Sequence, residues 1–150
     1  MEEKYTYSTL MTKIVEIERR IGGFYEKASR ARGGEVGELF KKYAAEARDR
    51  IDRIIQAKQM SVLEMTLETI TNIPIKQSTR EIEEIIKDKG MTVVEKAVEI
   101  ERKILELYKM VSEKIYFMSM DAATLLDELS KKAKTRINQL QTHKRKQAYK

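Results

Sequence analysis

The sequence predicts an all-α protein in which two helical hairpins are joined by a long crossover that carries a short extra helix. Long stretches place apolar residues at alternating steps of three and four, as on one face of a helix. Charged residues make up 36% of the 150 residues, whereas the chain has only six glycines and one proline, a composition that favours long helices over sheets. Short breaks separate the stretches in pairs, as in antiparallel helix pairs.

The first two helices are expected at about residues 6–30 and 35–59. The first ends where Gly33 and Gly34 permit a tight turn. A short connection between two long helices makes them antiparallel neighbours. The residues expected to face inward are Leu10, Ile14, Ile17, Ile21, Phe24 and Ala28 in the first helix, and Val36, Phe40, Tyr43, Ala47, Arg50 and Ile54 in the second.

The crossover is expected at residues 60–91. Pro74 interrupts any helix that precedes it. The sequence from Ser78 to Glu81 has the pattern of a capping box, which predicts a short helix that opens there and stops at Gly90. Ile82, Ile85 and Ile86 lie on one side of this helix.

The second hairpin is expected to begin at a second capping box, from Thr92 to Glu95, and its first helix to end at about Met118. After a break with Asp121 as N-cap, the last helix is expected to end at about Thr142. The predicted division is therefore a helical bundle over residues 1–142 and a basic, frayed tail over 143–150. The expected inward residues are Val94, Ala97, Glu101, Ile104, Leu105, Tyr108, Val111, Ile115, Leu126, Leu129, Ala133, Arg136, Ile137 and Leu140.

A five-residue sequence, Val-Glu-Ile-Glu-Arg, occurs twice, at residues 15–19 and 98–102. In each copy the second glutamate, Glu18 or Glu101, falls on the apolar stripe, and a tyrosine follows seven residues later, at Tyr25 or Tyr108. This correspondence indicates a duplicated helix pair. Two generic amphipathic helices that resemble each other are the alternative.

Two arginines, Arg50 and Arg136, also lie on apolar stripes, one on the second helix of each hairpin. Counted from the turns, each arginine lies at nearly the same height as the glutamate of its hairpin. Burying a lone charge is prohibitive, so the four side chains are expected to form a neutral cluster.

These residues resemble the rubrerythrin branch of the ferritin-like superfamily, whose four-helix bundles hold two iron atoms. In that family each hairpin supplies one Glu from its first helix and a Glu-x-x-His pair from its second. Glu18 and Glu101 match the first-helix glutamates, and Tyr25 and Tyr108 match tyrosines near the site. Ala47 and Ala133 stand where the resemblance expects the second glutamates, and Arg50 and Arg136 stand where it expects the histidines.

The resemblance therefore implies a ferritin-like bundle that has lost its di-iron site and binds no cofactor. Two carboxylates are too few for a stable di-metal site, and guanidiniums repel cations. Without cysteine, and with His143 assigned off the stripe, the sequence offers no nucleophilic catalyst. We expect a non-catalytic scaffold or partner-binding protein; an iron-binding oxidoreductase with a degenerate site is the first alternative.

The net charge of +6 arises at the C-terminal end, because residues 131–150 hold eight Lys and Arg and no acidic residue. Lys144, Arg145 and Lys146 are candidates for phosphate contacts, so weak binding to nucleic acid or another anionic surface is the second alternative. The chain has no apolar run of membrane-spanning length and no signal-peptide pattern, which favours a cytoplasmic protein. The Gly22-Gly23 pair suggests close approach of another helix, within the chain or in a homodimer, and a local kink of the first helix is the alternative.

Overall fold

The computed structural model describes residues 3–61 and 69–148, whose regular structure consists of α-helices and two short strands. The elements in order are β1 (Lys4–Thr6), α1 (Tyr7–Ala31), α2 (Gly34–Ser61), β2 (Thr69–Thr71), α3 (Ile75–Lys87), α4 (Val93–Ile115) and α5 (Met120–Ala148). Residues 62–68 of the predicted crossover and residues 149–150 of the predicted tail lie outside the described residues.

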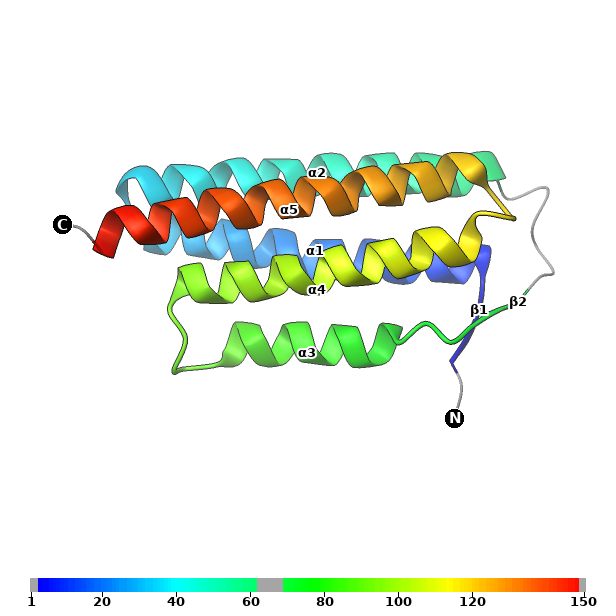
Figure 1. Ribbon diagram of the computed structural model, residues 1–150, viewed down its shortest axis with the longest axis horizontal. Coiled ribbons are helices and arrows are strands. Elements are labelled where there is room, and N and C mark those ends of the chain that lie inside the picture. Colours follow the sequence, from blue (N-terminus) through cyan, green and yellow to red (C-terminus); the bar gives the residue numbers. More distant parts are fainter. Residues whose placement is uncertain (1–2, 62–68, 149–150) are drawn as a thin grey trace.

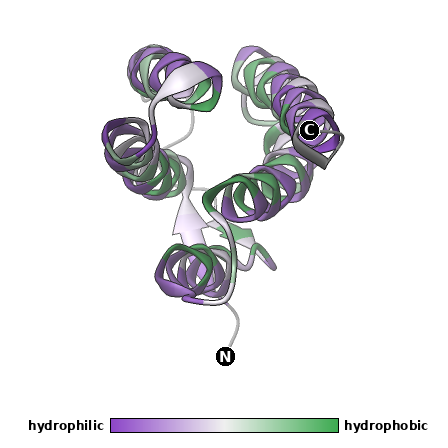
Figure 2. Ribbon diagram, turned by 90° about the vertical axis from the view of Figure 1, so that its left-hand side faces the viewer, coloured by the Kyte–Doolittle hydropathy of each residue, from purple (hydrophilic) through white to green (hydrophobic). Residues whose placement is uncertain are grey.

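Two antiparallel hairpins, α1 with α2 and α4 with α5, form the bundle (Figure 1). Seen along its length, the bundle turns many hydrophobic residues toward the interior and hydrophilic residues outward (Figure 2). The helix α3 packs against α4 and α1 and leaves α2 and α5 side by side on the opposite flank. None of the helices in the described ranges is long and apolar enough to cross a membrane.

The first hairpin begins with a side-chain cap and turns at a glycine. Thr6 caps α1, because its side chain accepts a hydrogen bond from the backbone N–H of Thr9. Gly34 has a φ of +70°, a left-handed conformation that glycine adopts without steric cost, so the predicted glycine turn is confirmed.

The crossover contains a strand that the sequence did not predict. β1 pairs with β2 in antiparallel register, with Tyr5 opposite Ile70. The ladder ties the N-terminus to the segment before α3, and the backbone N–H of Lys76 also donates to Glu3 Oε1 at 3.0 Å. Strands of three residues are too short to give a detectable alternating pattern.

The predicted capping box at Ser78 is wrong, because α3 already begins at Ile75 behind Pro74. Proline is tolerated at a helix start, where its missing N–H would have no intrahelical partner. Ser78 therefore lies inside the helix and donates its backbone N–H to Pro74 O. Lys103 of α4 and Arg20 of α1 hold this helix through ion pairs of 2.6 and 2.8 Å with acidic residues of α3.

The capping box at Thr92 and Glu95 is confirmed, with reciprocal bonds of 3.1 and 3.3 Å. The helix that it opens ends at Ile115, three residues before the predicted end. Asp121 is not the N-cap of α5, because Ser119 Oγ accepts the backbone N–H of Ala122. The last helix then continues to Ala148, six residues beyond the predicted end, so the residues expected to fray are helical up to that point.

Most residues predicted to face inward are buried, which confirms the stripes of the four long helices. The exceptions are half-buried and lie at the margins of the core: Phe24, Val94 and Leu105 on the long helices, with Ile85 and Ile86 on α3. Of the glycine pair in α1, only Gly22 has a close neighbour. A Cβ at Gly22 would lie 3.4 Å from Ala47 Cβ, so the helix that approaches it is α2 of the same hairpin.

Candidate functional site

The candidate site is a buried cluster of two ion pairs and two tyrosines in the middle of the bundle. Glu18 lies on α1 with 0% of its surface exposed. Arg50 on α2 donates from Nε to Glu18 Oε2 at 2.8 Å, and Tyr108 on α4 donates its hydroxyl to Glu18 Oε1. Both oxygens of this carboxylate therefore have donors, one from each hairpin.

The second pair repeats this arrangement in the other hairpin. Arg136 on α5 donates from Nε to Glu101 Oε2 on α4, and both side chains are buried. The guanidinium also reaches across to α2, where Arg136 Nη1 lies 3.9 Å from Glu46 Oε1. Each ion pair is thus formed inside one hairpin, while Tyr108 and Glu46 link the hairpins.

Helix geometry explains why these residues meet. Glu18 occupies the stripe between Ile14 and Ile21, which turns it toward the core with its apolar neighbours. In an antiparallel hairpin, residues equally far from the turn lie at equal height. Glu18 therefore faces Arg50, and Glu101 faces Arg136, as their contacts show.

The two tyrosines, although equivalent in sequence, have different environments. Tyr108 binds Glu18, whereas the buried hydroxyl of Tyr25 has no hydrogen-bond partner among the described residues. The ring of Tyr25 packs instead against Phe40 and Tyr43, with centroids 5.8 and 5.3 Å away. The internal correspondence of the sequence therefore does not extend to the hydrogen bonds of the tyrosines.

Several buried polar atoms of the cluster also lack a partner in the described part of the chain. They comprise both terminal nitrogens of Arg50, Nη2 of Arg136, Oε1 of Glu101 and the hydroxyl of Tyr25. Since buried charged groups are especially costly without hydrogen bonds, the arginine and glutamate atoms among them are where internal water molecules are expected.

Burial shifts the ionisation of the cluster. It raises the pKa of Glu101 above its ordinary value, and the positive charges of Arg136 and Arg50 reduce this shift without cancelling it. Burial also raises the pKa values of Tyr25 and Tyr108 well above the usual range for tyrosine, so both phenols stay protonated. Burial alone lowers the pKa of Arg50, but Glu18 and Glu101 outweigh it and keep this arginine charged.

The donor set does not fit a di-iron centre. Ala47 and Ala133 are buried at the positions where the resemblance expects two further carboxylates, and neither can bind a metal. Among residues 3–61 and 69–148, no three His, Cys, Asp or Glu side chains come together as a metal site. Glu18 and Glu101 each face a guanidinium, which is a permanent cation.

From the sequence, no polar role was assigned to three residues of the bundle: Glu46, Tyr43 and His143. Glu46 reaches Arg136 from the next helix, and Tyr43, predicted only as a core residue, donates its hydroxyl to Gln139 Oε1 at 2.6 Å. His143 was assigned off the stripe but is buried. His143 lies seven residues after Arg136 and three after Leu140, so it continues the apolar stripe of α5. This spacing could have predicted that His143 is buried.

The candidate phosphate contacts at the C-terminal end, Lys144, Arg145 and Lys146, are exposed on the last turns of α5. Lys144 forms an ion pair of 3.6 Å with Glu95, and Arg145 donates to Gln141 O within its own helix. Lys146 lines a groove between α2 and α5. The three side chains therefore do not converge on one site.

No protein-family model, no curated protein and no solved structure matches this chain.

Proposed function

We propose that this chain is a ferritin-like helical bundle without a working metal centre, and that it serves as a non-catalytic scaffold for a protein partner. In this proposal the two hairpins are copies of one ancestral pair, and the buried cluster occupies the place of the di-iron centre. The observation that carries the proposal is that each carboxylate expected to bind iron is hydrogen-bonded to an arginine.

The arginines supply what a cation would otherwise supply between the helices. A guanidinium neutralises a carboxylate and donates several hydrogen bonds in a fixed plane, so it can hold two helices together at a buried site. Two glutamates and two arginines sum to zero charge, which permits all four to be buried.

The partner-binding part of the proposal rests on exposed apolar side chains at one end of the bundle. Phe117, in the turn between α4 and α5, is 94% exposed, and Tyr116 and Met120 beside it are also exposed. The end of α2, which carries the exposed Met60, lies at the same end of the molecule (Figure 1). Exposed apolar groups that gather in this way are typical of protein interfaces. The partner proposed here is a second copy of the chain.

Elemental analysis tests the loss of the metal. Protein expressed with iron supplied and then dialysed is expected to contain only traces of iron, manganese and zinc. Close to two metal ions per chain would overturn the proposal and favour the iron-binding oxidoreductase instead.

Sedimentation analysis tests the partner. The wild-type chain is expected to self-associate at concentrations of up to about 100 µM, and Phe117→Ser is expected to weaken association at least about tenfold. Met110→Ser, a change at a partly exposed methionine of α4, is the control and should associate like the wild type. A wild-type chain that stays monomeric over this range would exclude the second copy as the partner.

A further inference from the structure

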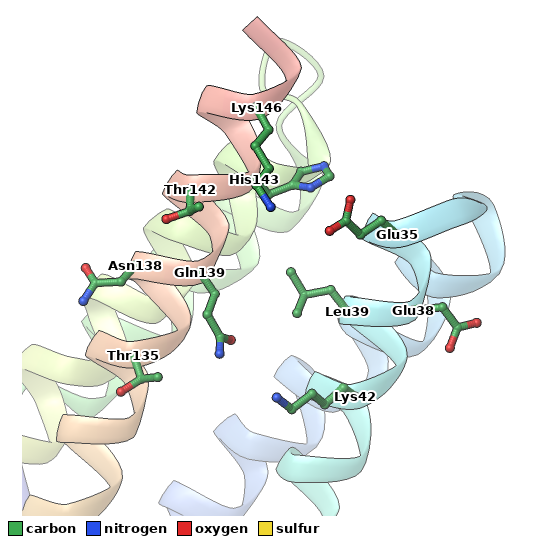
Figure 3. Close-up of a pocket in the computed structure, with 10 residues that line it drawn as sticks. All are labelled: Glu35, Glu38, Leu39, Lys42, Thr135, Asn138, Gln139, Thr142, His143 and Lys146. Atoms are coloured by element: carbon green, nitrogen blue, oxygen red, sulfur yellow. The ribbon is translucent and has the colours of Figure 1, made fainter. Parts of the chain in front are cut away.

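A groove of about 590 Å³ lies between the first turns of α2 and the last turns of α5 (Figure 3). It is separate from the buried ion pairs and from the apolar turn at Phe117. Residues of both hairpins line it, so only the assembled bundle forms it.

The α2 wall presents three different side chains in sequence. Glu35, Leu39 and Lys42 are spaced by four and three residues and therefore lie on one face of the helix. At 1.5 Å per residue, the carboxylate end and the ammonium end of this wall are about 10 Å apart along the helix axis. Leu39 lies between them and extends toward α5 (Figure 3).

The α5 wall contributes two hydrogen-bonding side chains, Gln139 and His143. They are four residues apart and therefore lie on one face of the helix. Gln139 accepts the hydroxyl of Tyr43 through Oε1, which leaves its amide NH₂ group as a donor. His143 is only 7% exposed, lines the groove, and has no hydrogen-bond partner for Nε2 within the described ranges. A buried polar atom of this kind normally has a partner, so an internal water molecule is expected beside it.

The charges of the groove are unevenly distributed. At the outer end, the groove is lined by both the negative Glu35 and the positive Lys146 (Figure 3). At the inner end, Lys42 has no ion-pair partner in the described part of the chain, and Glu38 points away from α5 (Figure 3). Glu46, one turn further along α2, faces Arg136 instead. The inner end therefore offers two donors, the Lys42 ammonium and the Gln139 amide, and Thr135, which carries a hydroxyl group, lines the groove beside them.

We propose that this groove binds a small organic anion with an apolar body. Its carboxylate or phosphate group accepts hydrogen bonds from Lys42 and Gln139, and its apolar body lies along Leu39 toward His143. This site goes beyond the scaffold role and does not depend on it.

The test is a titration of ¹⁵N-labelled full-length protein, followed by the backbone amide signals. The probes are hexanoate, hexyl phosphate, inorganic phosphate and hexanol, which separate the acidic group from the apolar body. Hexanoate or hexyl phosphate is expected to shift the signals of residues 39, 42, 139 and 143 and to reach saturation. Hexanol and inorganic phosphate should bind at least about tenfold more weakly. The tighter of the two organic anions identifies the acidic group as carboxylate or phosphate.

Two lysine variants complete the test. Lys42→Gln, at an exposed position, should weaken binding of the tighter probe about tenfold or more, because it removes a charge-assisted hydrogen bond. Lys41→Gln removes the same charge from the adjacent residue, which does not line the groove, and should leave binding unchanged. Signals that do not saturate, equal effects of the two lysine variants, or binding of hexanol as tight as that of hexanoate would each overturn the proposal.

Discussion

Removal of the arginine of the first hairpin should destabilise the protein strongly. Arg50→Ala leaves the buried carboxylate of Glu18 without its charged partner, and stranding a buried charge costs about 3–5 kcal/mol. We expect this loss in the free energy of unfolding, measured by urea denaturation.

The exposed pair between Arg48 and Glu26, at 2.7 Å on the same two helices, provides the control. Arg48→Ala should cost less than about 1 kcal/mol, because water screens the interaction. If both variants lose the same stability, Arg50 does not neutralise a buried charge.

The two tyrosines of the cluster should respond differently to the loss of the hydroxyl. Tyr108→Phe removes a donor from the buried Glu18 carboxylate and should cost about 1.5–3 kcal/mol. Tyr25→Phe removes a hydroxyl that has no partner among the described residues, so the stability should stay the same or rise. Thermal and urea unfolding of both variants measure the difference; similar losses would show that Tyr25 has a bonded partner, such as an internal water.

Glu101 should make the protein less stable as the pH rises. Because its pKa is raised above 4.5 in the folded state, the folded chain holds more protons than the unfolded chain between the two pKa values. The free energy of unfolding therefore falls as the pH rises above 4.5, and Glu101→Gln should remove that part of the slope in urea denaturation.

Glu128 is the control, because its effect on the free energy of unfolding should have the opposite dependence on pH. Its hydrogen bond with Arg53 lowers its pKa, so it adds stability above 4.5 that is lost as the pH falls. Glu128→Gln should therefore remove a slope in the other direction. A Glu101→Gln variant with the same pH dependence as the wild type would show that burial does not shift this carboxyl group.

The spacing of single residues was enough to predict the pairing of Glu18 with Arg50 and of Glu101 with Arg136, because the turn of a hairpin determines which residues lie at equal height. The contact between Tyr108 and Glu18 was not predictable in this way. It depends on how one hairpin is rotated against the other, and no local pattern encodes that rotation.

At the scale of an element, the start of α4 should depend on Thr92. Its side chain accepts the backbone N–H of Glu95, so Thr92→Ala should cost about 1 kcal/mol in urea denaturation. Ser78 has the same sequence pattern but lies inside α3, and Ser78→Ala should change stability by less than about 0.5 kcal/mol. A larger loss at Ser78 than at Thr92 would contradict these helix starts.

The helix stripes were predictable because burial imposes a regular spacing over many residues. Helix ends were less predictable, since the pattern at Ser78 also occurs inside a helix that Pro74 starts earlier. The strands β1 and β2 could not be predicted, because the formation of a three-residue strand depends on pairing with another strand rather than on its own sequence. His143 was missed because the end of α5 was expected to fray.

At the scale of the whole molecule, the proposed descent predicts that a metal site can be restored. Ala47→Glu and Arg50→His in one hairpin, combined with Ala133→Glu and Arg136→His in the other, would supply the ligands that the resemblance expects. The fourfold variant should bind about two Co²⁺ ions per chain, measured by equilibrium dialysis and by the absorption of bound cobalt.

The variant with only Arg50→His and Arg136→His is the control, because it removes the guanidiniums without adding carboxylates. It should bind cobalt at least about tenfold more weakly than the fourfold variant. A fourfold variant that is helical by circular dichroism but binds no cobalt would show that the hairpins do not correspond to the halves of a ferritin-like site.

The location of one complete ion pair in each hairpin also affects the order in which the protein folds. Each hairpin contains its own Glu–Arg pair, so each can neutralise its buried charges before it meets the other. Among the described residues of the cluster, the contacts made afterwards come from the Tyr108 hydroxyl and from the half-exposed Glu46. Docking therefore does not have to dehydrate an unpaired ion, and we infer that the hairpins form first from local contacts and join late, along a pathway without a large electrostatic barrier.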